Sequence, residues 1–247
     1  MLGLSLFEFE NNSDWNEAGP DSVRKANHIL YKYGVVDGFG HVSVRCHDND
    51  QTFWLSRNVA PSLVAVEDII RHDLRGEAYE GTDQKLYLER YIHAAIYKNR
   101  PDVVAIVHSH SQTIVPFGIS QDHSLKAVWH MAGFLGQQVP VFDMAIHYGD
   151  CTDLLITDMK MASVMASELG LGSVILMRGH GATIVGSSLP QAVYRAIYTE
   201  LNARIQLQAN TLGAIKEMSA GESKASVSRI SPQIKRAWDL WCEEIAS

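Results

Sequence analysis

The amino-acid sequence predicts an α/β protein with three layers, αβα, around a mixed central β-sheet. Apolar runs rich in β-branched residues, typical of buried strands, occupy residues 103–110, 173–178 and 181–186. Two shorter runs, at 41–46 and 52–56, are close enough in the chain to form a hairpin. Segments with helical apolar spacing alternate with these strands. Because such alternation places helices on both faces of a sheet, and hairpins add antiparallel pairs, we expect a mixed sheet between two helical layers.

Length and composition are those of an ordinary folded protein. The chain has 247 residues, of which 46% are hydrophobic and 20% charged, and no repeat or linker divides it. We therefore expect a single domain over residues 1–247, with residues 1 to about 15 flexible. The formal net charge of −7 and the lack of a basic run with interleaved aromatics argue against nucleic acid as a partner.

The N-terminal residues and the cysteines bear on location. The stretch at 1–16 has no positive n-region and acidic residues follow it at once, so we expect no signal peptide. No run of 18 or more apolar residues could span a bilayer. The three cysteines, Cys46, Cys151 and Cys242, form neither a disulfide framework nor a CxxC metal motif. We expect a cytoplasmic protein without a membrane partner.

The first elements are a helix and the hairpin. The residues at 20–22, Pro-Asp-Ser, open a helix that Gly34 ends. The strands 41–46 and 52–56 follow, separated by a polar run that favours a turn. The helix is amphipathic, with apolar residues at helical spacing: Val23, Ala26, Ile29 and Leu30.

The remaining elements alternate. A helix is predicted over 86–97, and Asn-Arg-Pro-Asp breaks it just before the strand 103–110. The strands 173–178 and 181–186 are joined by a tight Gly-His-Gly turn. A long helix then runs from Ser188 to about Leu212, and an amphipathic helix closes the chain over 232–245.

Three histidines carry the clearest chemical signal. His108 and His110 are two residues apart on a strand, so both imidazoles leave it on the same face. Alternatively, two polar residues merely end a strand, since a lone H-x-H pair is a weak motif. His180 favours the metal site over this alternative, because the glycines on both sides of it let the backbone bring an imidazole close to a bound ion. We predict that His108, His110 and His180 bind one metal ion.

Glu89 is a fourth candidate. It lies on the predicted helix that ends just before the H-x-H strand, so the connection is short enough to bring them together. Three imidazoles and one carboxylate leave room for a substrate, which is typical of a catalytic metal. They suit Zn²⁺ or Mn²⁺, and also Fe²⁺ or Co²⁺, at one ion per subunit. His93, on the same helical face as Glu89, is interpreted as a core residue or a neighbour of the ligands.

These motifs resemble the class II aldolase/adducin family. The segments that carry the resemblance are E-R-Y-I-H-A-A-I-Y (89–97), R-P-D-V-V-A-I-V-H-S-H (100–110) and G-H-G (179–181). G-F-G-H-V-S-V-R (38–45) corresponds to the family's early Gly-rich motif, and the match extends from about residue 20 to residue 212. The resemblance implies a three-layer αβα fold and a C4 homotetramer with active sites at subunit interfaces. It also implies the three histidines as metal ligands and Glu89 as the acid/base carboxylate.

The sequence departs from the family's sugar-phosphate aldolases at three places. It has His41 where they have Asn, Asn58-Val59 where they have Thr-Gly, and Tyr87-Leu88 where they have Ser-Ser. Because the small polar groups that hold a phosphate are replaced, a phosphorylated sugar is disfavoured.

Arginines and aromatic residues stand near these changes. Arg57, which follows Ser56, and Arg178, before the Gly-His-Gly turn, could each bind a carboxylate through two N–H groups. A solvated surface arginine is the common alternative. We predict Ser56, Arg57 and Arg178 as substrate contacts. Five aromatic residues could wall a flat substrate: Phe39, Trp54, Tyr87, Trp129 and Phe134.

Segments 56–70 and 128–136 are similar to a narrower branch, the decarboxylases of dihydroxyphthalate and hydroxymethylpyridine-dicarboxylate. The resulting hypothesis is metal-dependent loss of CO₂ from a hydroxylated aromatic carboxylate, with the metal as electron sink and Glu89 or His41 delivering the proton to the ring. Two alternatives stay open. One is an aldolase or epimerase acting on a non-phosphorylated hydroxy-carbonyl compound, and the other is an adducin-like scaffold without catalysis.

Overall fold

The computed structural model describes residues 19–246. The predicted flexibility of residues 1 to about 15 lies outside this range. Seven strands form one sheet in the order β3-β2-β1-β4-β7-β6-β5. All neighbouring strands are antiparallel except β5 and β6, which are parallel, so the sheet is mixed as predicted. The strands are β1 (His41–Arg45), β2 (Thr52–Ser56), β3 (Ile69–Asp73), β4 (Ala105–Ser109), β5 (Val141–Phe142), β6 (Val174–Met177) and β7 (Gly181–Gly186).

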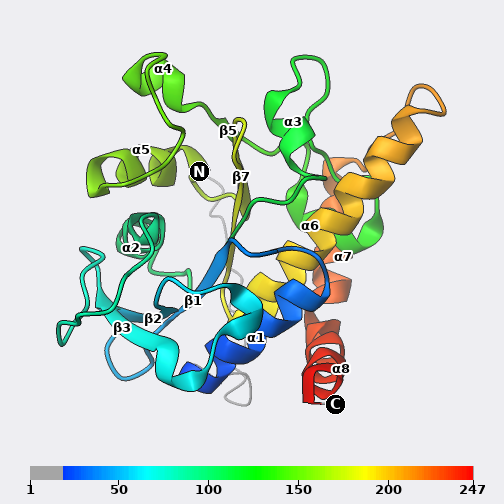
Figure 1. Ribbon diagram of the computed structural model, residues 1–247. Coiled ribbons are helices and arrows are strands. Elements are labelled where there is room, and N and C mark those ends of the chain that lie inside the picture. The colour runs from blue at the N-terminus through cyan, green and yellow to red at the C-terminus, as the bar shows by residue number, and fades with distance from the viewer. Residues whose placement is uncertain (1–18, 247) are drawn as a thin grey trace, which may run out of the picture.

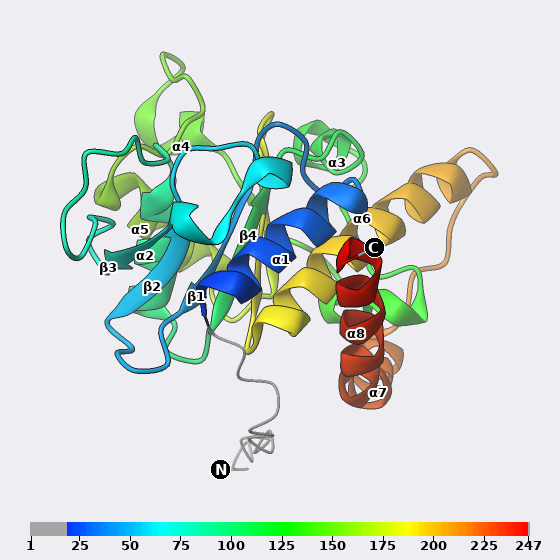
Figure 2. The ribbon, with the colours of Figure 1, turned by 60° about the horizontal axis from the view of Figure 1, so that its bottom comes forward.

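Helices cover both faces of the sheet, which confirms the three-layer αβα fold (Figure 1). On one side α1 and α6 lie next to each other across the strands, with α8 packed against both (Figure 2). On the other side α2 and α5 pack together. The long helices are α1 (Pro20–Lys32), α2 (Arg90–Asn99), α5 (Met159–Leu169), α6 (Leu189–Asn210), α7 (Ala220–Ile230) and α8 (Ile234–Ala246).

Short helices occupy the connections: α3 (Val115–Ile119), α4 (Met144–Tyr148), η2 (Pro61–Leu63), η3 (Val66–Asp68), η4 (His130–Leu135) and η5 (Ser231–Gln233). Within residues 19–246, no helix combines the length and the apolar character needed to cross a bilayer.

Alternation along β4 decides where the histidines point. Ala105 and Val107 belong to the apolar core beneath α1 and α6, whereas Ile106 belongs to the core beneath α2 and α5. His108, two residues after Ile106, therefore lies on the α2 side. Burying a side chain such as Ile106 is worth about 1.5–3 kcal/mol. Since a slip of one residue would expose these side chains to the wrong face, the register of β4 is strongly specified.

One predicted helix begins later than expected. The segment 86–97 was predicted as helix throughout, but α2 starts at Arg90 and Glu89 is its N-cap residue. The preceding residues pair with another part of the chain instead. The Lys85 carbonyl accepts a hydrogen bond from the Asn58 amide at 2.8 Å, and the Tyr87 hydroxyl donates to the Val59 carbonyl at 2.5 Å. These bonds hold residues 85–87 in an extended connection.

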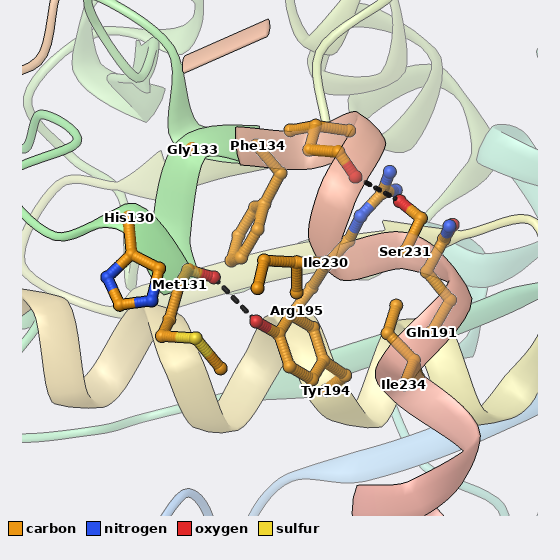
Figure 3. Close-up of a pocket in the computed structure, with 11 residues that line it drawn as sticks. His130, Met131, Gly133, Phe134, Gln191, Tyr194, Arg195, Ile230, Ser231 and Ile234 are labelled. Atoms are coloured by element: carbon orange, nitrogen blue, oxygen red, sulfur yellow. Dashed lines mark hydrogen bonds between the residues drawn. The ribbon is translucent and has the colours of Figure 1, made fainter. Parts of the chain in front are cut away.

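A pocket lies between η4, α6 and the α7–α8 region, as Figure 3 shows. Phe134 faces Tyr194 there, and the Tyr194 hydroxyl donates to the Met131 carbonyl at 2.7 Å. Trp129 packs nearby against Tyr198, with ring centroids 5.4 Å apart. These aromatics were expected to wall a substrate beside the histidines. The structure places them in the α6 region instead, and the pocket shares no residue with the histidine cluster.

Candidate metal centre

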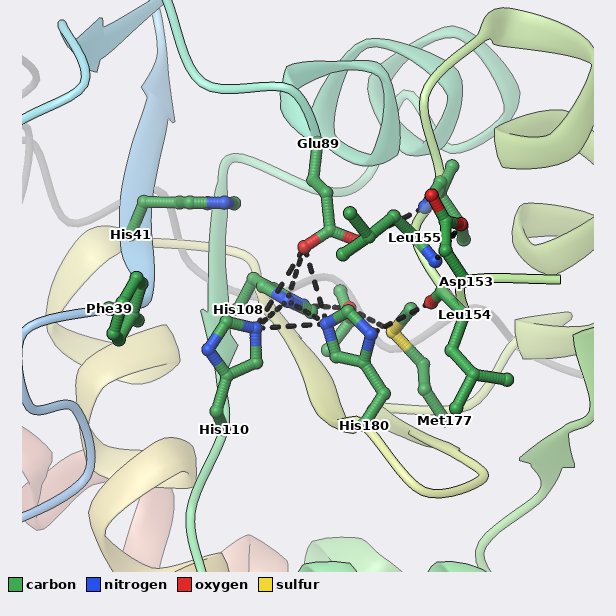
Figure 4. Close-up of polar contacts among 12 residues, drawn as sticks. Phe39, His41, Glu89, His108, His110, Asp153, Leu154, Leu155, Met177 and His180 are labelled. Carbon is green, nitrogen blue, oxygen red and sulfur yellow. Dashed lines mark hydrogen bonds and ion pairs between the residues drawn. The ribbon is translucent and has the colours of Figure 1, made fainter.

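The three predicted histidines meet in one cluster, which Figure 4 shows. His108 is on β4, His110 follows the end of that strand, and His180 lies in the turn between β6 and β7. Their Nε2 atoms form a small triangle. The separations are 3.0 Å between His108 and His110, 3.1 Å between His108 and His180, and 2.9 Å between His110 and His180. The structure thus brings together residues that are up to 72 positions apart.

Glu89 closes this cluster from the start of α2. Its Oε2 atom lies 3.3 Å from Nε2 of His108 and 3.2 Å from Nε2 of His180, and 3.8 Å from that of His110. Burial alone would raise the pKa of Glu89, but the neighbouring His108 and the hydrogen bonds to the three imidazoles hold it well below its usual range. Glu89 is therefore an ionised carboxylate facing three nitrogen atoms.

The donor atoms fit a single divalent ion. Two nitrogens bound about 2.0–2.1 Å from one ion, at angles between octahedral and tetrahedral, lie about 2.9–3.4 Å apart. The observed triangle falls within this range. His180 Nδ1 lies 2.8 Å from the Leu154 carbonyl. Because a carbonyl only accepts, Nδ1 donates to it, which leaves Nε2 as the ring nitrogen that can bind an ion.

His108 is held in a similar way. Its Nδ1 atom lies 3.1 Å from the Thr183 hydroxyl, on the neighbouring strand β7. Complete burial lowers the pKa of His108 to about 4, despite the opposing effect of Glu89. A neutral imidazole is the form that binds metal ions. Partners of this kind on the far ring nitrogen orient a ligand and support its basicity.

The segment 152–156, which sequence reasoning missed, orients two members of the cluster. The Leu154 carbonyl accepts from His180, and the Ile156 amide donates to Oε1 of Glu89 at 3.2 Å. Leu154 is the only non-glycine residue with positive φ among those described, at 65°. A side chain in that region costs roughly 1–2 kcal/mol. No sequence signal points to this role, since leucine rarely adopts such a conformation.

His41 lies beside the cluster on β1. Its Cα is paired with that of His108 across the sheet, and the two rings stack at 5.0 Å. The Tyr87 ring is 4.5 Å away, and His41 Nδ1 is 2.7 Å from His93 Nε2. Burial, and then the nearby His93 and His108, lower the pKa of His41 well below its usual range. His41 is therefore neutral. His93 contacts it and is not among the clustered side chains, as interpreted from the sequence.

The two predicted arginines have acidic partners within the chain. Arg57 Nε lies 2.6 Å from Oδ1 of Asp68, and Arg178 Nε lies 2.7 Å from Oδ2 of Asp143. The common alternative of a solvated surface arginine therefore does not apply, since each guanidinium is in an ion pair with an aspartate. Ser56, the third predicted contact, is completely buried, so its hydroxyl has no exposed surface to offer a substrate.

Of the remaining predicted aromatics, Phe39 and Tyr87 are near the cluster. Phe39 is 70% exposed, and its ring centroid lies 6.3 Å from that of His110. Trp54 instead packs with Arg71, whose guanidinium carbon is 5.5 Å from its ring centroid. The cluster is therefore flanked by two aromatic rings rather than five.

Fold and site together define a class of protein. It is an αβα protein in which three imidazoles and a carboxylate, oriented by hydrogen bonds to neighbouring residues, could hold a divalent ion. The sequence profile of the Class II Aldolase and Adducin N-terminal domain matches residues 21–207. The chain belongs to this family.

Named relatives narrow the class further. The chain is 36% identical over 241 residues to decarboxylase tropJ of Talaromyces stipitatus, covering 88% of this chain and 90% of that one. It is 28% identical over 210 residues to a 3,4-dihydroxyphthalate decarboxylase of Arthrobacter keyseri, covering 80% and 82%. Among solved structures, the L-fuculose 1-phosphate aldolase from Glaciozyma antarctica PI12 superposes with a TM-score of 0.69 at 25% identity, covering 91% and 90%. Family and relatives together indicate a lyase.

Proposed function

We propose that the protein is a metal-dependent decarboxylase of a hydroxylated aromatic carboxylate, such as a dihydroxyphthalate or a hydroxypyridine-dicarboxylate. The observation that carries this proposal is the packing of Tyr87 against His41 beside the cluster, with ring centroids 4.5 Å apart. These two rings occupy positions where the family's sugar-phosphate aldolases hold a phosphate with small polar groups. They suit a flat ring better than a phosphate. The names of the two relatives above, both decarboxylases, support the same assignment.

In this proposal His108, His110 and His180 hold one divalent ion through their Nε2 atoms. The ion supplies Lewis-acid chemistry that stabilises negative charge on the substrate's oxygen atoms. Glu89 or His41 first accepts a proton and then delivers it to the ring carbon that carries the carboxylate. The bond between that carbon and the carboxyl carbon breaks, CO₂ leaves, and the electron pair stays with the ring, so that one proton is consumed per CO₂ released.

A second substrate carboxylate needs a cationic partner. Arg57 and Arg178 each use Nε for an aspartate, and a guanidinium carries further N–H donors on its two Nη atoms. We assign these remaining donors to the second carboxylate. The aspartates hold both guanidinium groups in place, which lowers the entropic cost of binding the substrate.

The test is release of CO₂ from a panel of ring acids. Protein loaded separately with Zn²⁺, Mn²⁺, Fe²⁺ and Co²⁺ is incubated with 3,4-dihydroxyphthalate and with hydroxypyridine-dicarboxylates, and CO₂ and the decarboxylated ring are both quantified. We expect turnover that a chelator abolishes and that His108→Ala lacks. Cleavage of an aldol compound without CO₂ release from any ring acid would refute the proposal.

The structural similarity to a fuculose 1-phosphate aldolase favours one rival, an aldolase or epimerase acting on a non-phosphorylated hydroxy-carbonyl compound. It uses the same cluster, so the substrate panel must include such compounds. A non-catalytic scaffold is the other rival. Metal analysis of the purified protein separates it, because a stoichiometric ion at the cluster supports an enzyme.

We further propose a homotetramer whose small-molecule sites lie at subunit interfaces, as the family resemblance implies. Light scattering during gel filtration measures the mass of the assembly directly. A monomer that is fully active would contradict the assignment of the site to an interface. The single domain over residues 1–247 and the cytoplasmic location stay predictions from the sequence.

A further inference from the structure

A row of hydrogen bonds leads from His41 into the core. His41 Nδ1 is 2.7 Å from His93 Nε2, and His93 Nδ1 is 2.6 Å from the Ser43 hydroxyl. The Ser43 hydroxyl is 2.8 Å from the Tyr97 hydroxyl, which lies 3.3 Å from the Val104 carbonyl. The four side chains are buried, and each of the three inner ones, His93, Ser43 and Tyr97, has one polar partner on either side. Such a row has a direction, because each proton sits on one atom of every pair.

The carbonyl at the inner end sets this direction. Val104 can only accept, so the Tyr97 O–H donates to it, and burial raises the pKa of Tyr97, which keeps that proton in place. Ser43 then donates its single proton to the Tyr97 oxygen and accepts from Nδ1–H of His93.

The same direction of hydrogen bonding continues through the imidazoles of His93 and His41 toward the cluster. His93 and His41 are buried, and within residues 19–246 neither has a hydrogen bond to a carboxylate that would compensate a positive charge, so each ring is neutral and has one proton. Since the proton of His93 is on Nδ1, its Nε2 accepts from Nδ1–H of His41. The Nε2 atom of His41 is left without a proton. Figure 4 shows the His41 side chain extending toward Glu89 and the cluster.

We propose that His93, Ser43 and Tyr97 are positioning residues that fix His41 as the Nδ1–H tautomer, with an unprotonated Nε2 facing the site. Among the described residues, no hydrogen bond or ion pair joins them to the cluster, and they act through His41. Nothing in the tautomer itself depends on which reaction the site catalyses. The consequence for catalysis rests on the proposed decarboxylation.

Because its Nε2 carries no proton, His41 must accept a proton from the substrate before it can donate one. In the proposed reaction it takes the proton of the ring hydroxyl, and the ring oxygen keeps the electron pair of the broken O–H bond. His41 then gives this proton to the ring carbon that carries the carboxylate. The C–C bond breaks as CO₂ leaves, its electron pair restores the aromatic ring, and the oxygen regains a proton from water. Charge and atoms balance with one proton taken up from water.

The tautomer can be read directly. With histidines labelled in ¹⁵N, long-range ¹H–¹⁵N correlation spectra of the Zn²⁺-loaded protein distinguish Nδ1–H from Nε2–H, and a His41→Gln variant assigns the signal. We expect Nδ1–H for His41 in the unmodified protein. In Tyr97→Phe, Ser43 loses its acceptor and turns its proton to His93, so His41 changes to Nε2–H. Ser43→Ala has the same expected result. Without the serine hydroxyl, His93 can donate its proton only to Nδ1 of His41, so His41 carries its own proton on Nε2.

Tyr194→Phe is the matched control. It removes a buried hydroxyl that also donates to a backbone carbonyl, at 2.7 Å, but lies in the pocket of Figure 3 away from the row. We expect no change of tautomer and no change of rate in this variant. In Tyr97→Phe, kcat should fall about 10–100-fold, a part of what general acid–base catalysis provides, with KM within about threefold.

Two outcomes would overturn the inference: Nε2–H on His41 in the unmodified protein, or Nδ1–H retained in both Tyr97→Phe and Ser43→Ala. A failure of the proposed function looks different. In that case no ring acid releases CO₂, while the tautomer and its response to the variants are as expected.

Discussion

Replacing Gly181 with alanine would place a methyl carbon 1.9 Å from the carbonyl oxygen of Ser109 and 3.0 Å from Cα of His110. These are backbone atoms, so no side-chain rotation relieves the overlap. Gly181 begins β7, directly after His180, and Ser109 ends β4, with His108 before it and His110 after it. Whichever strand moves, it carries a histidine of the cluster with it.

The size of the effect follows from these distances. The oxygen and the new methyl carbon must move apart by about 1.5 Å to reach the 3.4 Å at which ordinary contact begins. Metal–ligand distances tolerate deviations of roughly 0.2 Å. Since the displacement is several times larger, we expect at least one imidazole to leave the coordination geometry. Metal affinity should fall by about 100-fold or more, and the free energy of unfolding by about 1–3 kcal/mol from overpacking.

Competition with a chromophoric zinc chelator measures the affinity, and urea unfolding of the metal-free protein measures stability. Gly221→Ala serves as control, because a methyl group there meets only the Ser219 Oγ at 3.9 Å. It adds the same atom without the overlap. A Gly181→Ala variant that binds Zn²⁺ as tightly as the unmodified protein would show that the cluster does not depend on this close approach.

Three further outcomes test the site and its surroundings. Thr183→Val removes the hydroxyl beside His108 Nδ1 without changing shape and should weaken metal binding about 10–100-fold in the same chelator assay; unchanged affinity would contradict its role. Glu89→Gln keeps an acceptor for the Ile156 amide but loses the charge, so kcat/KM should fall about 10²–10⁴-fold while urea unfolding still shows a folded protein. Burial lowers the pKa of His72 from 6.5 to about 4, so below pH 6.5 the unfolded chain takes up a proton that the folded chain refuses. Stability should drop by about 3 kcal/mol between pH 6.5 and 4 from this residue, and His72→Gln should show a smaller loss in urea titrations across that range.

Local pattern was sufficient to predict the central strands and the histidine cluster. The β-branched run before His108 and the two-residue spacing to His110 specify a strand and a shared face, and the glycines around His180 specify a tight turn. Both features depend on neighbours in sequence. For the same reason the hairpin of β1 and β2 was predicted at nearly its observed bounds.

Features that depend on distant partners were not predicted. The late start of α2 comes from bonds to the 58–59 segment. The ion pairs of Arg57 with Asp68 and of Arg178 with Asp143 depend on how loops fold back. The strands β3 and β5 and the helices α5 and α7 were also missed, since their apolar patterns are short or mixed with polar residues.

Three side chains lie in one row across the sheet: His41 on β1, His108 on β4 and Thr183 on β7. The strands that carry them come from segments up to 142 residues apart, so the row exists only after the slow, non-local pairings have formed in the correct register. A slipped β4 would bury as much chain yet turn His108 toward α6. Uptake of Zn²⁺ during refolding would therefore report correct strand register, and could separate native molecules from compact misfolded ones.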